Sequence, residues 1–276
     1  MVGKFKIGEA GVSVLGIAAV RRDLDQIAEI FPTVGREALR SAIKTVQPDS
    51  GGEYLDWYFN ATLIQIPNQT ILVDTGFGFS AGAPGLGTAQ LLAECGVQVE
   101  EVNTIVITHG HGDHIGGLSE DGAPTMPNAR VVISRQEYEF WMNGNADRHF
   151  GAKGAAAQKT TLSLCRDQIE CIDMDFPIAE SDGTIIRTLP APGHTPGHIG
   201  ISVSSQGERL WLLVDTIHTL FQLDHPDWSP RFDVDPYLSR TTRKALLEQA
   251  ARLGVSAHLY HFPFPALGYI EASDQA

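Results

Sequence analysis

Histidine and aspartate are concentrated in one short stretch of the chain, His109-Gly110-His111-Gly112-Asp113-His114. The stretch directly follows the apolar run 102–107, which has the composition of a buried strand, and its glycines predict a tight turn where that strand ends. Imidazole nitrogens and carboxylate oxygens are the ligands that zinc and similar divalent ions bind in proteins. A polar surface turn is the alternative interpretation, but histidine is too rare for it to explain this density. We therefore predict a metal site here.

Further candidate ligands stand where other predicted strands end. His194 lies in a rigid Gly-His-Thr-Pro turn after the strand 185–189, and Asp215 ends the apolar strand that begins at Arg209. A buried acid needs a cation or several hydrogen-bond donors, although Asp215 could also cap the turn that follows. Near the carboxyl end, His258 and His261 compete for one role: His258 lies inside the strand 255–260, and His261 follows it before a proline.

Asp74 ends the strand 70–73 and precedes a sharp Thr-Gly turn. It could cap that turn, or it could hydrogen-bond the histidine-rich loop, because histidines that bind metal usually need a partner for their second nitrogen.

Together these residues resemble the motifs of the metallo-β-lactamase-fold hydrolases. The resemblance rests on His-x-His-x-Asp-His, on Asp74-Thr75-Gly76, on Gly193-His194-Thr195-Pro196-Gly197-His198, and on the terminal histidine, and it covers residues 54–268. It implies that His194 and His261 are ligands and that Asp215 bridges two metals. It also implies an α/β fold, a four-layer αβ/βα sandwich of two mixed β-sheets face to face with helices outside.

Seven ligands are too many for one tetrahedral zinc ion but suit two ions that share a carboxylate. By resemblance, His109, His111 and His194 hold the first ion and Asp113, His114 and His261 hold the second. The ions are expected to be Zn²⁺, with Fe, Mn or Co as alternatives. A bridging hydroxide would attack the substrate, and Asp113 would act as a catalytic residue that orients this nucleophile and helps to move its proton.

Within the family, several segments most resemble methyl parathion hydrolase and its lactonase relatives. This implies a metal-dependent enzyme that hydrolyses an uncharged ester, lactone or aryl phosphotriester. We expect a substrate pocket lined by His218 and by apolar aromatic residues, drawn from Trp57, Phe140, Trp141, Phe221, Phe262 and Phe264. The alternatives are a β-lactamase or a glyoxalase II-like thioester hydrolase of the same fold, and, in a different class, a metal-binding or sensor protein without turnover.

The elements that position these residues follow from apolar periodicity. Residues 4–20 predict one or two strands, 21–46 two short helices, and 54–66 a strand that pairs with 70–73. We expect 143–154 to be an exposed polar loop beside the site. With no repeat or linker in the sequence, we expect one domain over 1–276, in which 1–50 is an N-terminal extension of strands and helices.

Composition limits the partners. The formal net charge is −13 and no basic stretch offsets it, which argues against nucleic acid and favours a small-molecule substrate. No apolar run has membrane-spanning length, no signal peptide is visible at the start, and the three cysteines show no Cys-x-x-Cys pattern. These features predict a cytoplasmic protein that does not contact membranes; a homodimer is compatible with them.

Overall fold

The computed structural model describes residues 1–78 and 85–272, and it is built around two mixed β-sheets. The first sheet has the order β1-β2-β3-β4-β5-β8-β9, in which β1 to β4 are antiparallel and β4, β5, β8 and β9 are parallel. The second has the order β10-β11-β12-β13-β14-β15 and is antiparallel except between β13 and β14. A short ribbon pairs β6 with β7.

The strands of the first sheet are β1 (Val2–Ile7), β2 (Ala10–Asp23), β3 (Tyr54–Ile66), β4 (Gln69–Val73), β5 (Thr104–Ile107), β8 (Arg130–Ser134) and β9 (Ile169–Ile172). Those of the second are β10 (Pro177–Ser181), β11 (Thr184–Pro190), β12 (Ile199–Ser205), β13 (Glu208–Leu212), β14 (Ser256–His258) and β15 (Leu267–Tyr269), and the ribbon is β6 (Ser119–Glu120) and β7 (Ala123–Pro124).

The α-helices are α1 (Leu24–Ile30), α2 (Arg36–Val46), α3 (Thr88–Glu94), α4 (Gly112–Ile115), α5 (Arg135–Met142), α6 (Asn145–Phe150), α7 (Ala152–Leu164), α8 (Phe221–Asp224) and α9 (Pro236–Leu253). Short 3-10 turns are η1 (Pro48–Ser50), η2 (Val99–Glu101), η3 (Gly116–Leu118) and η4 (Val214–Thr216). Within the described ranges, no helix combines the length and the apolar character needed to cross a membrane.

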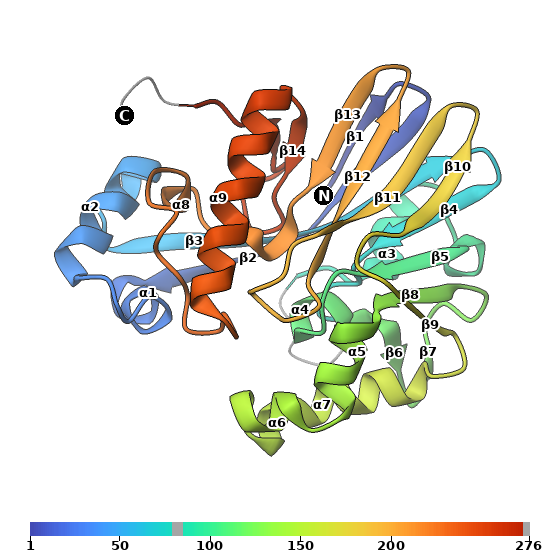
Figure 1. The fold of residues 1–276 in the computed structure, drawn as a ribbon, viewed down its shortest axis with the longest axis horizontal. Helices are drawn as coiled ribbons and strands as arrows, with labels where there is room; N and C mark the ends of the chain where they lie inside the picture. Colours follow the sequence, from blue (N-terminus) through green and yellow to red (C-terminus); the bar gives the residue numbers. More distant parts are fainter. Residues whose placement is uncertain (79–84, 273–276) are drawn as a thin grey trace.

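The core lies between the sheets and beneath the helices. Apolar side chains of β5 and β8 from the first sheet share one buried cluster with Ile186, Ile201 and Val203 from the second. Helix α9 lies beside β14 (Figure 1) and buries Leu246, Leu247 and Ala250 in a separate cluster against the second sheet. The predicted sandwich of two mixed sheets with outer helices is confirmed.

Every candidate ligand follows the end of a strand at one edge of this sandwich. Because β4 and β5 are parallel and adjacent, their carboxyl ends bring Asp74 and the loop 109–114 together. The second sheet contributes the β11–β12 turn with His194, the η4 turn after β13 with Asp215, and the segment after β14 with His261.

Two local predictions are wrong. Residues 143–154 do not form a loop: they contain α6 and the start of α7, which pack against α5 at the lower end of the molecule in Figure 1. Gly144 and Gly151 suggested a loop, but both have positive φ and flank α6, so they separate helices. The predicted strand 255–260 is shorter than expected, because β14 ends at His258.

Candidate metal centre

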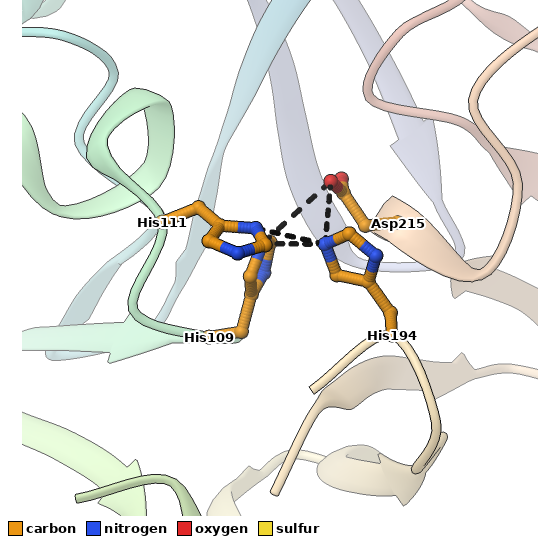
Figure 2. Close-up of side chains that lie close together, drawn as sticks. All are labelled: His109, His111, His194 and Asp215. Atoms are coloured by element: carbon orange, nitrogen blue, oxygen red, sulfur yellow. Dashed lines mark hydrogen bonds and ion pairs between the residues drawn. The ribbon is translucent and has the colours of Figure 1, made fainter. Parts of the chain in front are cut away.

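Three histidines from the two sheets direct their ring nitrogens at one point. His109 Nε2 lies 3.0 Å from His111 Nδ1, and His194 Nε2 lies 3.2 Å from the first of these atoms and 2.9 Å from the second. Asp215 Oδ2 completes the group at 3.6 Å from His109 Nε2 and 3.4 Å from His194 Nε2. Figure 2 shows the four side chains converging, His109 and His111 from one loop and His194 and Asp215 from two other turns.

A second group adjoins the first and shares Asp215. His114 Nε2 lies 3.4 Å from Asp113 Oδ2 and 3.3 Å from Asp215 Oδ1, and His261 Nε2 lies 3.6 Å from Asp113 Oδ2 and 3.3 Å from Asp215 Oδ2. The ligand atoms within each group all lie within 4.8 Å of one another. Asp215 therefore faces both groups, as a bridging carboxylate would.

The outer nitrogens of His114 and His109 face hydrogen-bond acceptors, whereas His111 Nε2 has none among the described residues. His114 Nδ1 lies 2.8 Å from Asp74 Oδ2, and Asp74 also accepts from the backbone N–H and the hydroxyl of Thr108. Since the Thr108 hydroxyl donates its proton to Asp74, its oxygen is left to accept from His109 Nδ1 at 3.2 Å. Both rings therefore carry their proton on the outer nitrogen.

Two of the other rings, His194 and His261, are held in the same way. His194 Nδ1 lies 2.9 Å from Asp233 Oδ1. His261 Nδ1 has two neighbours of opposite kind: the carbonyl oxygen of Tyr58 at 2.8 Å and the indole N–H of Trp57 at 2.9 Å. A neutral ring that turns Nε2 inward needs its proton on Nδ1, which selects the Tyr58 carbonyl as the partner.

The inward nitrogens consequently present lone pairs to one another, and this is an arrangement that needs a cation. Among the described residues, His114 Nε2 and Asp215 Oδ1 face these groups and are buried without a hydrogen-bond partner. Zn–N bonds of 2.0–2.1 Å place the nitrogens of a tetrahedral site about 3.3 Å apart. The separations of 2.9–3.2 Å in the three-histidine group are close to that value. The residues present thus fit a divalent metal in both composition and spacing.

Burial and charge act against each other at these groups. Burial lowers the pKa of His109 and His111 well below the ordinary value, which favours the neutral rings that bind metal. Burial acts to raise the pKa of the Asp215 carboxyl, but the surrounding histidines, His114 foremost, lower it well below the usual range. Burial opposes the charge on His114, yet Asp215, Asp113 and Asp74 raise the pKa of that ring well above normal, so a metal ion would have to displace a second proton from its Nε2.

A cavity of about 460 Å³ opens onto both groups. Its wall includes Asp113, Asp215, His111 and His261 together with His218. The remainder is largely aromatic: Trp57, Phe59, Phe77, Trp141, Phe150 and Phe232. Trp141 and Phe150 stack with ring centroids 5.5 Å apart, so a flat apolar surface borders the metal groups.

The structure brings all seven predicted ligands together and separates other candidates from them. His258 is outside the ligand groups, with Nδ1 3.5 Å from Thr62 Oγ1, so the geometry favours His261 over it. Among the predicted pocket residues, Trp57, Trp141 and His218 line the cavity.

Four predicted pocket residues, Phe140, Phe221, Phe262 and Phe264, do not line this cavity. Phe221 is buried and packs on Phe31 and Trp228, and Phe264 packs against Gly16 of β2. These side chains pack the surrounding elements together. Their apolar character alone does not show whether they lie in the core or in the pocket.

Sequence reasoning missed two contributions to the centre. His218, expected only in the pocket wall, also lies with Nε2 3.2 Å from Asp215 Oδ2 and forms a third ligand-like group with Asp215 and His261. Its spacing of three residues from Asp215 within a short turn was the available signal. Asp233, which holds His194, lies in an irregular segment before α9, and no local pattern marks it.

Comparison with known proteins agrees with this geometry. A model of the metallo-beta-lactamase superfamily matches residues 56–258. The chain is 28% identical to metallo-beta-lactamase domain-containing protein 1 of Xenopus laevis over 204 residues, which cover 73% of this chain and 71% of that protein. It is also 28% identical to an N-acyl homoserine lactonase of a Bacillus species over 217 residues, which cover 70% of this chain and 77% of the relative.

Solved structures extend the likeness to nearly the whole chain. A structure of AidC, described as a dizinc quorum-quenching lactonase in complex with a product, N-hexanoyl-L-homoserine, superposes with a TM-score of 0.88 at 26% identity and covers 100% of this chain and 95% of that chain. The hydrolase AbOPH, in the beta lactamase superfamily, gives a TM-score of 0.85 at 24% identity over 99% of this chain and 94% of that chain. The second likeness shows the shared fold.

Proposed function

Because the chain belongs to the metallo-beta-lactamase superfamily, we propose that this metal-dependent hydrolase opens lactones that carry an apolar acyl substituent, using two zinc ions. The observation that carries the proposal is the set of inward-facing lone pairs on either side of Asp215. Such a set favours two cations that share one carboxylate.

In this proposal each of the two ligand groups holds one metal ion. His109, His111 and His194 hold the first ion, Asp113, His114 and His261 hold the second, and Asp215 lies between them. When bound, the ions would lower the pKa of water to roughly 7 and polarise the carbonyl under attack. Zinc suits the mixed imidazole and carboxylate donors, and Fe, Mn or Co would fit the same donor set.

The side chains around the ions supply orientation and proton transfer. Asp113 borders the cavity and is the most exposed of the acids at the site, so its carboxylate can orient the attacking water and accept its proton. His218 lines the same wall; its Nε2 faces Asp215 Oδ2 at 3.2 Å, and among the described atoms its Nδ1 is buried without a hydrogen-bond partner. Its ring can therefore hydrogen-bond the carbonyl group of a bound substrate.

The cavity supports an uncharged substrate with an apolar portion. Its aromatic wall favours an acyl chain or a ring over a polyanion, and its volume suits a small molecule. The N-acyl homoserine lactonases among the relatives act on molecules of this kind. An aryl phosphotriester also satisfies the shape and polarity of the cavity and is the second candidate, because the stacked Trp141 and Phe150 rings offer a face for an aryl group.

The test compares substrates on the same protein preparation. The protein loaded with zinc is assayed with N-hexanoyl homoserine lactone, an aryl phosphotriester, a cephalosporin and a glutathione thioester, with ring opening or hydrolysis followed by chromatography. We expect the highest kcat/KM for the lactone, a content of about two zinc ions per chain, and loss of turnover after chelation. Cleavage of the cephalosporin or the thioester alone would overturn the substrate class, and a metal content of zero would overturn the site.

A further inference from the structure

One buried carboxylate joins the two loops that carry the three-histidine group. Glu137 lies on α5 and is fully buried. Its Oε1 accepts from the backbone N–H of Gly110 at 2.9 Å and from the indole N–H of Trp141 at 2.7 Å. Its Oε2 accepts from the Thr195 hydroxyl at 2.6 Å and from the backbone N–H of Gly197 at 3.1 Å.

These four donors belong to separate parts of the fold. Gly110 lies between His109 and His111 in the loop after β5 of the first sheet. Thr195 directly follows His194 in the turn between β11 and β12 of the second sheet. The Glu137 carboxylate therefore spans the two sheets at the level of the metal groups. Trp141 is one turn further along α5, where it forms part of the cavity wall.

The segments around the Glu137 carboxylate are tightly packed, and two glycines allow them to approach α5 this closely. A Cβ on Gly110 would lie 2.2 Å from Trp141 Nε1, and a Cβ on Gly197 would lie 2.1 Å from the Glu137 backbone nitrogen. Ser134, at the start of α5, accepts from the Glu137 N–H and donates to the Gly197 carbonyl oxygen. The start of α5 is thus fastened to the turn after His194 by both side chain and backbone.

The partners of this acid favour its ionised form. Burial raises the pKa of the Glu137 carboxyl, while the four hydrogen bonds oppose that rise. Three of the donors are N–H groups, which cannot accept a proton in return. A neutral amide at the same place has only one acceptor oxygen, so it cannot satisfy all of them.

We propose that Glu137 is a positioning residue that sets the distance between the His109–His111 loop and His194, and so determines the affinity of the first metal subsite. The inference rests on the proposed dinuclear site and concerns only the three-histidine half of it. The second half is held by different residues, Asp74 and the Tyr58 carbonyl, which do not contact Glu137.

Glu137→Gln tests this asymmetry. The amide oxygen can keep the bonds to Gly110 and Trp141, whereas its NH₂ group then faces the Gly197 N–H, and that bond is lost. The turn after His194 should loosen while the Gly110 side stays in place. Removal of a direct hydrogen-bond partner of a metal ligand typically weakens metal binding about 10- to 100-fold. Because Glu137 acts through the loops that carry the ligands, we expect the lower end of this range: one of the two stepwise zinc affinities should fall about tenfold and the other should stay near the wild-type value.

The affinities are measured by competition with a chromophoric chelator, and the visible spectrum of the Co²⁺-loaded protein reports ligand geometry without any turnover. Glu139→Gln, an exposed glutamate on the same helix, is the matched control and should leave both affinities and the spectrum unchanged. Thr195→Val is a milder variant that deletes only the hydrogen bond from the Thr195 hydroxyl to Glu137 Oε2. It should weaken the same subsite even if Glu137→Gln fails to fold.

The possible results distinguish a failure of the role of Glu137 from a failure of the proposed function. If wild-type protein binds two ions and both Glu137→Gln and Thr195→Val bind them with unchanged affinity, the role of Glu137 is refuted and the metal site stands. An equal loss at both subsites also refutes it, because Glu137 would then support the fold in general. Wild-type protein that binds no ion would refute the proposed function, and this role with it.

Discussion

Asp74→Asn isolates the contribution of a single buried hydrogen bond to the second metal subsite. Asp74 has a φ of +61°, a conformation that asparagine tolerates well, so the backbone turn should survive the substitution. The amide oxygen can still accept from the Thr108 backbone N–H. The amide NH₂, however, must face His114 Nδ1, which now donates to Oδ2 at 2.8 Å.

Two N–H groups cannot occupy that contact, so the His114 proton is expected to move to Nε2. That nitrogen faces Asp113 and Asp215 and would lose the lone pair with which it binds metal. A hydrogen bond to a charged group contributes about 1.5–3 kcal/mol, which corresponds to roughly a 10- to 150-fold loss in affinity. The 10- to 100-fold effect that is typical of outer partners of metal-bound histidine falls in the same range.

The assay is a zinc titration of the metal-free protein against a competing chelator, combined with urea unfolding in excess zinc. A 10- to 100-fold weaker site should lower the free energy of unfolding of the loaded protein by about 1.4–2.7 kcal/mol. Asp182→Asn is the matched control, since Asp182 also has positive φ but is exposed and distant in sequence from the site. Unchanged zinc affinity in Asp74→Asn would refute the reasoning from tautomers.

Three further predictions follow from other contacts. Asp215→Ala should abolish turnover and reduce the metal content below two ions while leaving the circular dichroism spectrum unchanged; retained turnover would place the bridge elsewhere. Gly110→Ala should lower the free energy of unfolding by about 1–3 kcal/mol, because its Cβ would meet the Trp141 indole at 2.2 Å, whereas Gly112→Ala, with only a side-chain amide at 3.5 Å, should change it much less. Burial raises the pKa of the Cys165 thiol to about 11, so the folded protein keeps a proton that the unfolded chain loses, and stability should fall as pH rises through 9 to 11. That loss, about 3 kcal/mol at most, should be smaller in Cys165→Ala, and parallel curves for the two proteins would contradict the assignment.

The ligand residues were predictable from the sequence because each stands directly after an apolar strand. The carboxyl ends of neighbouring parallel strands meet at one edge, so residues far apart in the chain, such as Asp74 and His114, are brought together by topology alone. The residue types then indicate the chemistry. The strands β4, β5 and β8 were visible as apolar runs, and the helices α1 and α2 as separate apolar stripes on either side of Pro32.

Other parts could not be predicted because they depend on contacts between distant segments. Helix α6 is a short polar stretch between two glycines, and only its packing against α5 and α7 explains why it is helical. Strand β10 is stabilised by pairing with β11, although its own sequence begins with proline and includes Glu180. The aromatic residues carry no sequence signal that separates the cavity wall from the core, so Phe221 and Trp141 looked alike.

Glu137 shows how a local pattern can even point away from the structure. Ser134-x-x-Glu137 has the form of a capping box, in which the glutamate would turn back to the first residue of the helix. Ser134 does cap α5 by accepting from the Glu137 N–H, but the glutamate side chain instead spans the loops of both sheets. The competing donors are contributed by residues 27 positions before it and about 60 positions after it, beyond the reach of any local rule.

The identity of a ligand can be predicted from the local sequence, but its protonation depends on contacts with distant segments. The sequence identifies the histidines, but each histidine binds metal only if the nitrogen that faces the site is the one without a proton. That choice is made by acceptors that lie elsewhere: Asp74 for His114, Asp233 for His194, and the Tyr58 carbonyl for His261. A chain that kept every ligand but lost these acceptors would still match the family's motifs and would bind metal weakly. The motifs alone therefore predict where a metal can be held, and the outer hydrogen bonds decide how tightly it is held.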